Sequence, residues 1–265
     1  MATYVMSDIH GCYGAFSELL DKSGYKKDED ELIIAGDIID RGPENLKMLE
    51  YAYSAPKGVT FLMGNHDYDF MKYCNILIHL YSSKKVSEDV SLQELVTSDD
   101  YYYTFRNNVM DYYDTIYNLI KQNPELSLDD FKRWKSMIKK FPYYIKKKIN
   151  GKDYIIVHAG YITEENYDNF KLSLSRQGIK SIEMFYMWAR DESVLIGGEP
   201  DTTVVFGHTP TITDTLYNNC GKVFRANLDH KRFINIDCGY VFKKFDKYAN
   251  LACIRLDDEK IFYLL

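Results

Sequence analysis

Three short apolar runs divide the first 66 residues of the chain, and each run closes in a cluster of polar residues. The runs cover residues 3–6, 31–35 and 59–63, and apolar side chains at helical spacing lie between them. This alternation predicts a βαβαβ unit. Ligands of open α/β sheets bind beyond the carboxyl ends of the strands, so the three polar clusters are expected at a binding edge.

The chain changes character after about residue 68. Tyrosines become frequent, glycine is absent from residues 68–141, and apolar residues recur at helical spacing. We expect a helical insertion over about 68–148. Ser127 and Asp130 resemble a capping box that opens its last helix.

Strand patterns return after the insertion. The last strands are closely spaced, which suggests antiparallel pairing. The sequence shows no internal repeat and no Pro/Ser-rich linker, so we expect a single domain over residues 1–265 with the helices as a cap. The later strand patterns cover residues 154–157, 203–206, 232–236, 251–255 and 261–264.

Charge and cysteine content narrow the class of protein. Lys plus Arg is 33 against 39 for Asp plus Glu, a formal charge of -6, which argues against nucleic-acid or membrane binding by the whole surface. No apolar run is long enough for a membrane span, and no signal-like segment opens the chain. The five scattered cysteines form no CxxC pair and are expected to be reduced thiols of a cytoplasmic protein. They are Cys12, Cys74, Cys220, Cys238 and Cys253.

Asp, Asn and His gather where the expected strands end. Four of the six histidines fall there beside glycine or alanine. One such histidine alone is more often structural than a ligand, but four of them together with three aspartates favour a site. A mixed carboxylate, imidazole and amide set suits Mn, Fe or Zn better than Ca or Mg. The residues are Asp8, His10, Asp37, Asp40, Asn65, His66, His158 and His208.

Such a set predicts chemistry at phosphorus. An aspartate that bridges two metals holds them roughly 3.5–4 Å apart, and the pair polarises phosphoryl oxygens and activates a shared water. An alkoxide leaving group still needs a proton from a positioned acid, which an unligated histidine can supply.

Five segments of the chain, in order, resemble the signature of calcineurin-like metallophosphoesterases. More narrowly, Asp40-Arg41-Gly42 resembles the bacterial and phage branch of the phosphoprotein phosphatase family, which includes serine/threonine protein phosphatases and diadenosine tetraphosphatases. One such segment is weak evidence, whereas five in order are strong. The segments are Asp8-Ile9-His10-Gly11, Gly36-Asp37-Ile38-Ile39-Asp40-Arg41-Gly42, Gly64-Asn65-His66-Asp67, His158-Ala159-Gly160 and Gly207-His208-Thr209-Pro210.

The resemblance implies an α/β fold of two mixed sheets packed face to face, with flanking helices. It implies that Asp8, His10 and Asp37 hold one divalent metal ion, and that Asp37 bridges to a second ion held by Asn65, His158 and His208. Manganese is expected for both ions, with iron or zinc as alternatives.

The resemblance also assigns roles around the metals. His66 is the expected general acid, oriented by Asp40, and Arg41 clamps phosphate oxygens through its planar fork. Asn65 is expected to contact substrate as well as metal, and Arg190 resembles the family's second phosphate arginine. The function that the resemblance implies is that of a serine/threonine protein phosphatase, which would use a metal-bound hydroxide on a phosphorylated protein or peptide.

The sequence departs from the pattern of the family's protein phosphatases at two places, so other substrates are also considered. Protein phosphatases of the family often have arginine two residues before the metal-binding asparagine, where this chain has Met63. That feature, together with Met1-Ala2-Thr3-Tyr4, resembles the diadenosine tetraphosphatase branch, so cleavage of a dinucleoside polyphosphate is the alternative. The Tyr-rich insertion matches neither branch. An inactive module that binds a phosphorylated ligand is the third interpretation.

Residues 132–152 contain nine basic and no acidic side chains. We interpret this stretch as a solvated helix face followed by a short strand with outward lysines. A patch that steers acidic substrates is the alternative.

Overall fold

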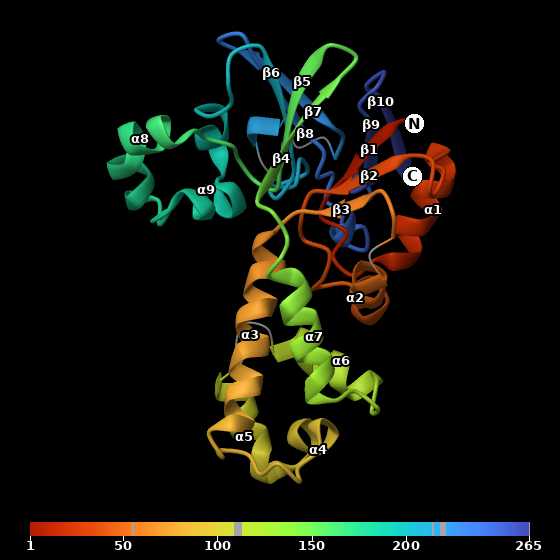
Figure 1. The fold of residues 1–265 in the computed structure, drawn as a ribbon, viewed down its shortest axis with the longest axis vertical. Coiled ribbons are helices and arrows are strands. Elements are labelled where there is room, and N and C mark those ends of the chain that lie inside the picture. The colour runs from red at the N-terminus through yellow and green to blue at the C-terminus, as the bar shows by residue number, and fades with distance from the viewer. Residues whose placement is uncertain (55, 109–112, 214, 218–220, 265) are drawn as a thin grey trace.

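The computed structural model describes residues 1–54, 56–108, 113–213, 215–217 and 221–264. Two five-stranded mixed sheets pack face to face, and helices lie on their outer sides (Figure 1). This arrangement confirms the expected fold class.

The first sheet contains the βαβαβ unit expected at the start of the chain. Its strand order is β10-β9-β1-β2-β3, with β1, β2 and β3 parallel and with β9 and β10 added antiparallel. The helices α1 (Tyr13–Ser23) and α2 (Asn45–Ser54) connect the parallel strands. The strands are β1 (Thr3–Met6), β2 (Glu31–Ile34), β3 (Val59–Phe61), β9 (Leu251–Arg255) and β10 (Lys260–Leu264).

The second sheet has the order β4-β5-β6-β8-β7. Its three central strands are parallel, and each edge strand is antiparallel to its neighbour. The helices α8 (Glu164–Arg176) and α9 (Ile182–Trp188) pack on its outer face. The strands are β4 (Tyr144–Ile149), β5 (Lys152–Val157), β6 (Thr202–Phe206), β7 (Phe224–Leu228) and β8 (Lys231–Asn235). Short 3-10 helices lie in the connections of this part of the chain, at Asp191–Leu195, Thr215–Tyr217 and Tyr240–Phe242.

Alternate side chains of the central strands enter different cores. Val5 and Ile33 face the second sheet, whereas Tyr4 and Leu32 pack under α1 and α2. Successive side chains of a strand point to opposite faces, so a strand covered on both faces must be apolar throughout. This explains the continuous apolar runs of the sequence.

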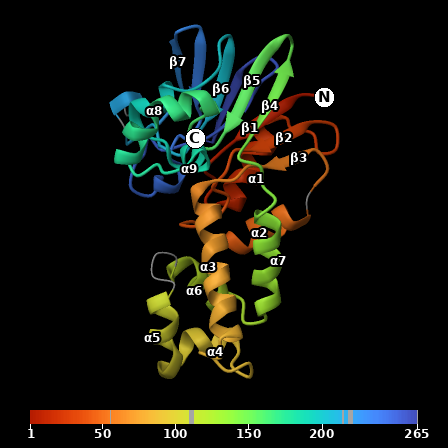
Figure 2. The ribbon, with the colours of Figure 1, turned by 60° about the vertical axis from the view of Figure 1, so that its left-hand side comes forward.

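Five α-helices of the described residues form an arm that extends away from the sheets (Figures 1 and 2). The two longest, α3 and α7, lie side by side and bury Phe70, Phe131 and Trp134 between them and their neighbours. Asp130 accepts hydrogen bonds from the Ser127 backbone N–H and hydroxyl, both at 2.8 Å, at the start of α7. The helices are α3 (Asn65–Ser82), α4 (Leu92–Thr97), α5 (Asp99–Asn108), α6 (Tyr113–Gln122) and α7 (Leu128–Ile138).

The helical arm differs slightly in its bounds from the expected insertion over about 68–148. The first helix already begins at Asn65, and β4 (Tyr144–Ile149) belongs to the second sheet. The strand β7 was also not expected. Both missed strands are at sheet edges and are only partly buried, so their apolar pattern is weak.

The basic stretch 132–152 forms the exposed face of α7 followed by β4 and the start of β5. Six of its nine basic side chains pair with acidic ones, which supports a solvated helix face and an outward strand rather than a steering patch.

Two sequence expectations concern cysteines and membranes. Cys12, Cys74 and Cys253 are free thiols, and Cys220 lies outside the described residues. Within the described chain, no helix is both long and apolar enough to cross a membrane.

Candidate metal centre

The loops that follow β1, β2, β3, β5 and β6 meet at one edge of the two sheets. Several of their residues adopt left-handed backbone conformations, which are uncommon for non-glycine residues and cluster at functional sites. Close approach of the loops also requires glycine, because a Cβ at Gly64 would clash with Asp37 Oδ1 and one at Gly207 would clash with Asp8 Oδ2. The residues with positive φ here are Asp8, His10, Asp37, Asp40, Arg41 and His208.

Four potential ligand atoms converge at the position expected for the second metal. His158 Nε2 lies 3.0 Å from Asn65 Oδ1, 3.2 Å from His208 Nδ1 and 3.5 Å from Asp37 Oδ2. The other ring nitrogen of His158 lies 2.9 Å from the Ala35 carbonyl and must donate to it, so Nε2 presents a lone pair. A cation matches this convergence of lone pairs.

The position expected for the first metal is built in the same way. His10 Nδ1 donates to the Ile39 carbonyl at 3.0 Å, which leaves the lone pair of Nε2 facing Asp37 Oδ2 at 3.7 Å. Potential ligand atoms of His10, Asp37 and His66 lie within 4.8 Å of one another, as do those of Asp37, His158 and His208.

Asp8 belongs to neither of these close sets of described residues. Its Oδ2 accepts a hydrogen bond from the His208 backbone N–H at 3.0 Å. Its Oδ1 is buried and accepts no hydrogen bond from any described residue. An unsatisfied buried carboxylate oxygen beside Asp37 fits a metal ligand.

The electrostatics of the centre also fit divalent cations. Asp8, Asp37, Asp67 and Asp237 are each at most 4% exposed. Burial, together with the charge of Asp8, raises the pKa of both Asp37 and Asp237 well above the usual range. Divalent ions would offset this accumulation of buried negative charge.

Two of the three histidines expected as ligands, His10 and His208, are neutral. Burial lowers the pKa of His10 and of His208 well below the ordinary value, and nearby positive groups act in the same direction. Neutral imidazole is the form that binds metal. The residues present therefore fit a pair of divalent ions.

His66 and Asp40 form a hydrogen-bonded dyad beside these expected ligands. His66 Nδ1 lies 2.7 Å from Asp40 Oδ2, and His66 Nε2 lies 3.9 Å from Asp37 Oδ2. Burial acts to lower the pKa of His66, but the charge of Asp37 and the hydrogen bond to Asp40 outweigh it and raise the pKa. Burial acts to raise the pKa of Asp40, but hydrogen bonds from His66 and Thr115 lower it to about 2.

Both arginines expected to bind phosphate lie at the centre. Arg41 donates to His10 Nε2 at 3.1 Å, and its Nη2 lies 2.9 Å from His66 Nε2, so its guanidinium group lies between the dyad and the first ligand set. Arg190 donates to Thr209 Oγ1 at 3.2 Å, next to His208, which is expected to be a ligand. The fold thus brings every residue of the expected site to the same edge of the sheets.

Three residues hold the site residues in place, and no role was expected of any of them from the sequence. Asp67 is fully buried and accepts hydrogen bonds from the backbone N–H groups of Asp37, Ile38 and Gly64 at 2.8–3.1 Å. Asn45 accepts from the Asp40 backbone N–H at 2.7 Å, and Thr115 donates to the Asp40 carboxylate. Asp67 directly follows the expected site residues Asn65 and His66, and this position could have indicated its role. No sequence pattern indicates a role for Thr115.

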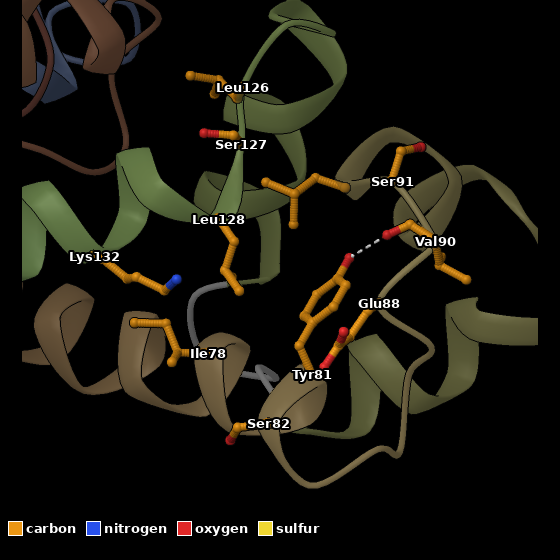
Figure 3. Close-up of a pocket in the computed structure, with 11 residues that line it drawn as sticks. Ile78, Tyr81, Ser82, Glu88, Val90, Ser91, Leu126, Ser127, Leu128 and Lys132 are labelled. Atoms are coloured by element: carbon orange, nitrogen blue, oxygen red, sulfur yellow. Dashed lines mark hydrogen bonds between the residues drawn. The ribbon is translucent and has the colours of Figure 1, made fainter.

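Cavities elsewhere differ from the centre in their chemistry. A cavity of about 540 Å³ in the helical arm is lined mainly by apolar side chains, including Ile78, Val90 and Leu128 (Figure 3). It contains none of the expected site residues. A cavity of about 510 Å³ beside the centre is instead lined by polar groups, including Asp40 and Arg41.

Comparison with known proteins agrees with this geometry. Residues 1–242 match the family model described as calcineurin-like phosphoesterase. The chain belongs to this family. Its His/Asp sets are groups able to hold the divalent metals that the family uses.

Among curated relatives, a symmetrical bis(5'-nucleosyl)-tetraphosphatase of Buchnera aphidicola subsp. Acyrthosiphon pisum (strain 5A) is 51% identical over 67 residues, 25% of this chain and 24% of that protein. The protein of the same name from Hamiltonella defensa subsp. Acyrthosiphon pisum (strain 5AT) is 32% identical over 130 residues, 49% of this chain and 41% of the relative. The matches thus span about a quarter to two-fifths of these relatives.

Among solved structures, that of "a putative diadenosine tetraphosphatase" has a TM-score of 0.56 and 17% identity, covering 99% of this chain and 92% of the other. This likeness shows a shared fold.

Proposed function

We propose that this chain is a dinuclear metal-dependent phosphatase that removes phosphate from phosphoserine or phosphothreonine in a protein or peptide. The first ion would be held by Asp8, His10 and Asp37, and the second by Asp37 together with a further group of ligands. Manganese is the proposed metal, with iron or zinc as alternatives. The further ligands are Asn65, His158 and His208.

The observation that carries the choice of substrate is the Asp40–His66 dyad. Asp40 accepts the Nδ1 proton of His66, and the other ring nitrogen, Nε2, lies 2.9 Å from Arg41 Nη2 and 3.9 Å from Asp37 Oδ2. A proton on Nε2 can pass to the oxygen that leaves phosphorus. Serine and threonine alkoxides need this proton, whereas weakly basic leaving groups do not.

When bound, the two ions would polarise the phosphoryl oxygens and lower the pKa of a water molecule. The side chains of the protein perform the remaining tasks. Arg41 and Arg190 bind phosphoryl oxygens with planar guanidinium groups, which match a phosphate bidentately. Asn65 lies at the start of α3, next to His66, and would contact both metal and substrate.

Cleavage of a dinucleoside tetraphosphate is the second candidate. It is favoured by the names of the matched relatives, which act on such a substrate as their names state. Met63 is 3% exposed and packs in the core under the first sheet, so no phosphate-binding side chain occupies that position. A nucleotide leaving group is less basic than an alkoxide and depends less on His66.

A panel of three substrates tests the proposal. We would measure kcat for a phosphoserine peptide, p-nitrophenyl phosphate and diadenosine tetraphosphate with manganese, in the wild type and in His66→Asn. The variant should retain metal and lose about 10²–10⁴-fold in kcat on the phosphopeptide, with much smaller losses on the other two. His79→Asn, an exposed position on the same helix, is the matched control.

The outcomes separate the candidates. Turnover of diadenosine tetraphosphate far above that of the phosphopeptide would replace the first candidate with the second. Equal losses on all three substrates would remove His66 from the acid role, and loss of one metal ion would make it a ligand. Bound metal without turnover of any substrate would favour a phospho-ligand binding module.

A further inference from the structure

The helical arm contributes one side chain to the dyad. Thr115 lies near the start of α6, 75 positions along the chain from Asp40, and is 5% exposed. Its hydroxyl group donates a hydrogen bond to Asp40 Oδ1. The other carboxylate oxygen, Oδ2, pairs with His66 Nδ1 at 2.7 Å.

Each oxygen of the Asp40 carboxylate therefore has a different partner. The backbone of Asp40 is held separately, by the hydrogen bond from its N–H to Asn45 Oδ1 at 2.7 Å, in a left-handed conformation with φ 77°. Backbone anchoring does not determine how the carboxylate is rotated. The Thr115 hydroxyl group restricts that rotation, because it donates a hydrogen bond to Oδ1 while Oδ2 accepts one from His66.

We propose that Thr115 is a positioning residue: by fixing the Asp40 carboxylate, it orients the His66 ring so that Nε2 faces the substrate. This inference rests on the acid role of His66 given under the proposed function. It also gives the helical arm a part in catalysis, since α3 begins with Asn65 and His66 while α6 supplies Thr115. In Figures 1 and 2 both helices belong to the same arm.

The surroundings of Thr115 allow a clean substitution. The polar cavity of about 510 Å³ is lined by Thr115, Asp40 and Asn118, so small changes at Thr115 have space beside them. Thr115→Val keeps the shape and removes the hydroxyl group, and Thr115→Ser keeps the hydroxyl group. Thr97→Val is the matched control, because Thr97 is an exposed residue of the same arm that donates to the Gln93 carbonyl.

Kinetics give the first test. Thr115→Val should lower kcat on a phosphoserine peptide on the order of tenfold, as expected for a group that orients a functional side chain. The KM and the metal content should not change, and p-nitrophenyl phosphate should be affected much less. Thr115→Ser should restore most of the rate, and Thr97→Val should behave as the wild type.

A double-mutant cycle tests the route of the effect. If Thr115 acts through Asp40, then Thr115→Val should cost nothing further in a chain that already carries Asp40→Asn. Additive losses would overturn the proposal, because they would mean that Thr115 acts independently of Asp40. A uniform loss on both substrates that Thr115→Ser does not restore would assign Thr115 a merely structural role.

An NMR measurement separates this inference from the proposed function. In the zinc-loaded protein, which is diamagnetic, the Nδ1–H signal of His66 should move or broaden in Thr115→Val and return in Thr115→Ser. His66→Asn assigns the signal by its loss. An unchanged signal overturns the inference even if the enzyme is a protein phosphatase, whereas a changed signal supports it even if the phosphopeptide proves not to be the substrate. Thr115→Ala replaces Thr115→Val if the latter does not fold.

Discussion

Glu259 is expected to join the two sheets at the end of the molecule opposite the metal centre. It lies in the turn between β9 and β10 of the first sheet, and its carboxylate accepts two hydrogen bonds from Arg232 of β8 at 2.8 and 2.9 Å. Lys152 of β5 contacts the same carboxylate at 2.9 Å, and the Tyr154 hydroxyl does so at 3.2 Å. Glu259→Gln removes the charge and keeps the shape, so it measures this link between the sheets.

The size of the effect follows from the pKa of Glu259. The hydrogen bond from Arg232, with that from Lys152, lowers the pKa from 4.5 to about 2. At about 1.4 kcal/mol per pKa unit, this difference sets a ceiling of about 3.5 kcal/mol. Because the Arg232 side chain is 37% exposed, solvent screening reduces the expected loss of unfolding free energy to about 1–2 kcal/mol.

The pH dependence has a definite sign. A carboxylate whose pKa is lowered by folding stabilises the folded state above its unfolded pKa, and the stabilisation is lost as the pH falls from about 4.5 toward 2. Wild type and Glu259→Gln should therefore differ most near pH 7 and converge in acid. At pH 7 the Tm of the variant should fall by about 2–6 °C.

Urea unfolding of both proteins at pH 7, 5, 4 and 3.5 measures the difference. Glu18→Gln is the control, because Glu18 forms an exposed ion pair with Lys22, for which the expected contribution is below about 0.5 kcal/mol. A difference at pH 7 no larger than the control, or one that stays constant down to pH 3.5, would refute the reasoning.

Three further predictions concern the metal centre. Chelation should abolish activity and manganese should restore it, and activity that survives chelation would contradict the proposal. Asp37 is shared by both ligand sets, so Asp37→Asn should lower metal content and activity more than any other ligand change. Arg41→Lys should cost about 10- to 100-fold in kcat/KM, since a charged hydrogen bond contributes about 1.5–3 kcal/mol and an ammonium group cannot replace the planar fork; unchanged kinetics would place Arg41 outside the site. Asp67→Ala should lower the unfolding free energy by about 3–5 kcal/mol in urea, because three buried N–H groups lose their acceptor, whereas Asp69→Ala, at an exposed ion pair, should have little effect.

The strands show where sequence reasoning succeeds. The central strands of both sheets were expected from their apolar runs, because burial on two faces leaves no place for polar residues. The edge strands β4 and β7 were missed, because β4 carries Lys146, Lys147 and Lys148 and β7 is largely exposed. Their pairing depends on the neighbouring strand rather than on their own composition.

The sequence by itself determined which residues gather at the site. Asp8, Asp37, Asn65 and His158 each follow a strand that has at least one parallel neighbour, and the carboxyl ends of parallel strands meet at one edge of a sheet. Chain direction and apolar pattern are local properties, so this convergence can be inferred from the amino-acid sequence alone.

Only the tertiary structure decided how these side chains are held. The Ala35 carbonyl sets the ring orientation of His158 across 123 positions of sequence, and Thr115 reaches Asp40 across 75. Asp67 accepts hydrogen bonds from backbone N–H groups of two different loops. Such contacts join segments whose spacing along the chain carries no pattern, because hydrogen-bond partners are chosen by distance and direction in the folded protein.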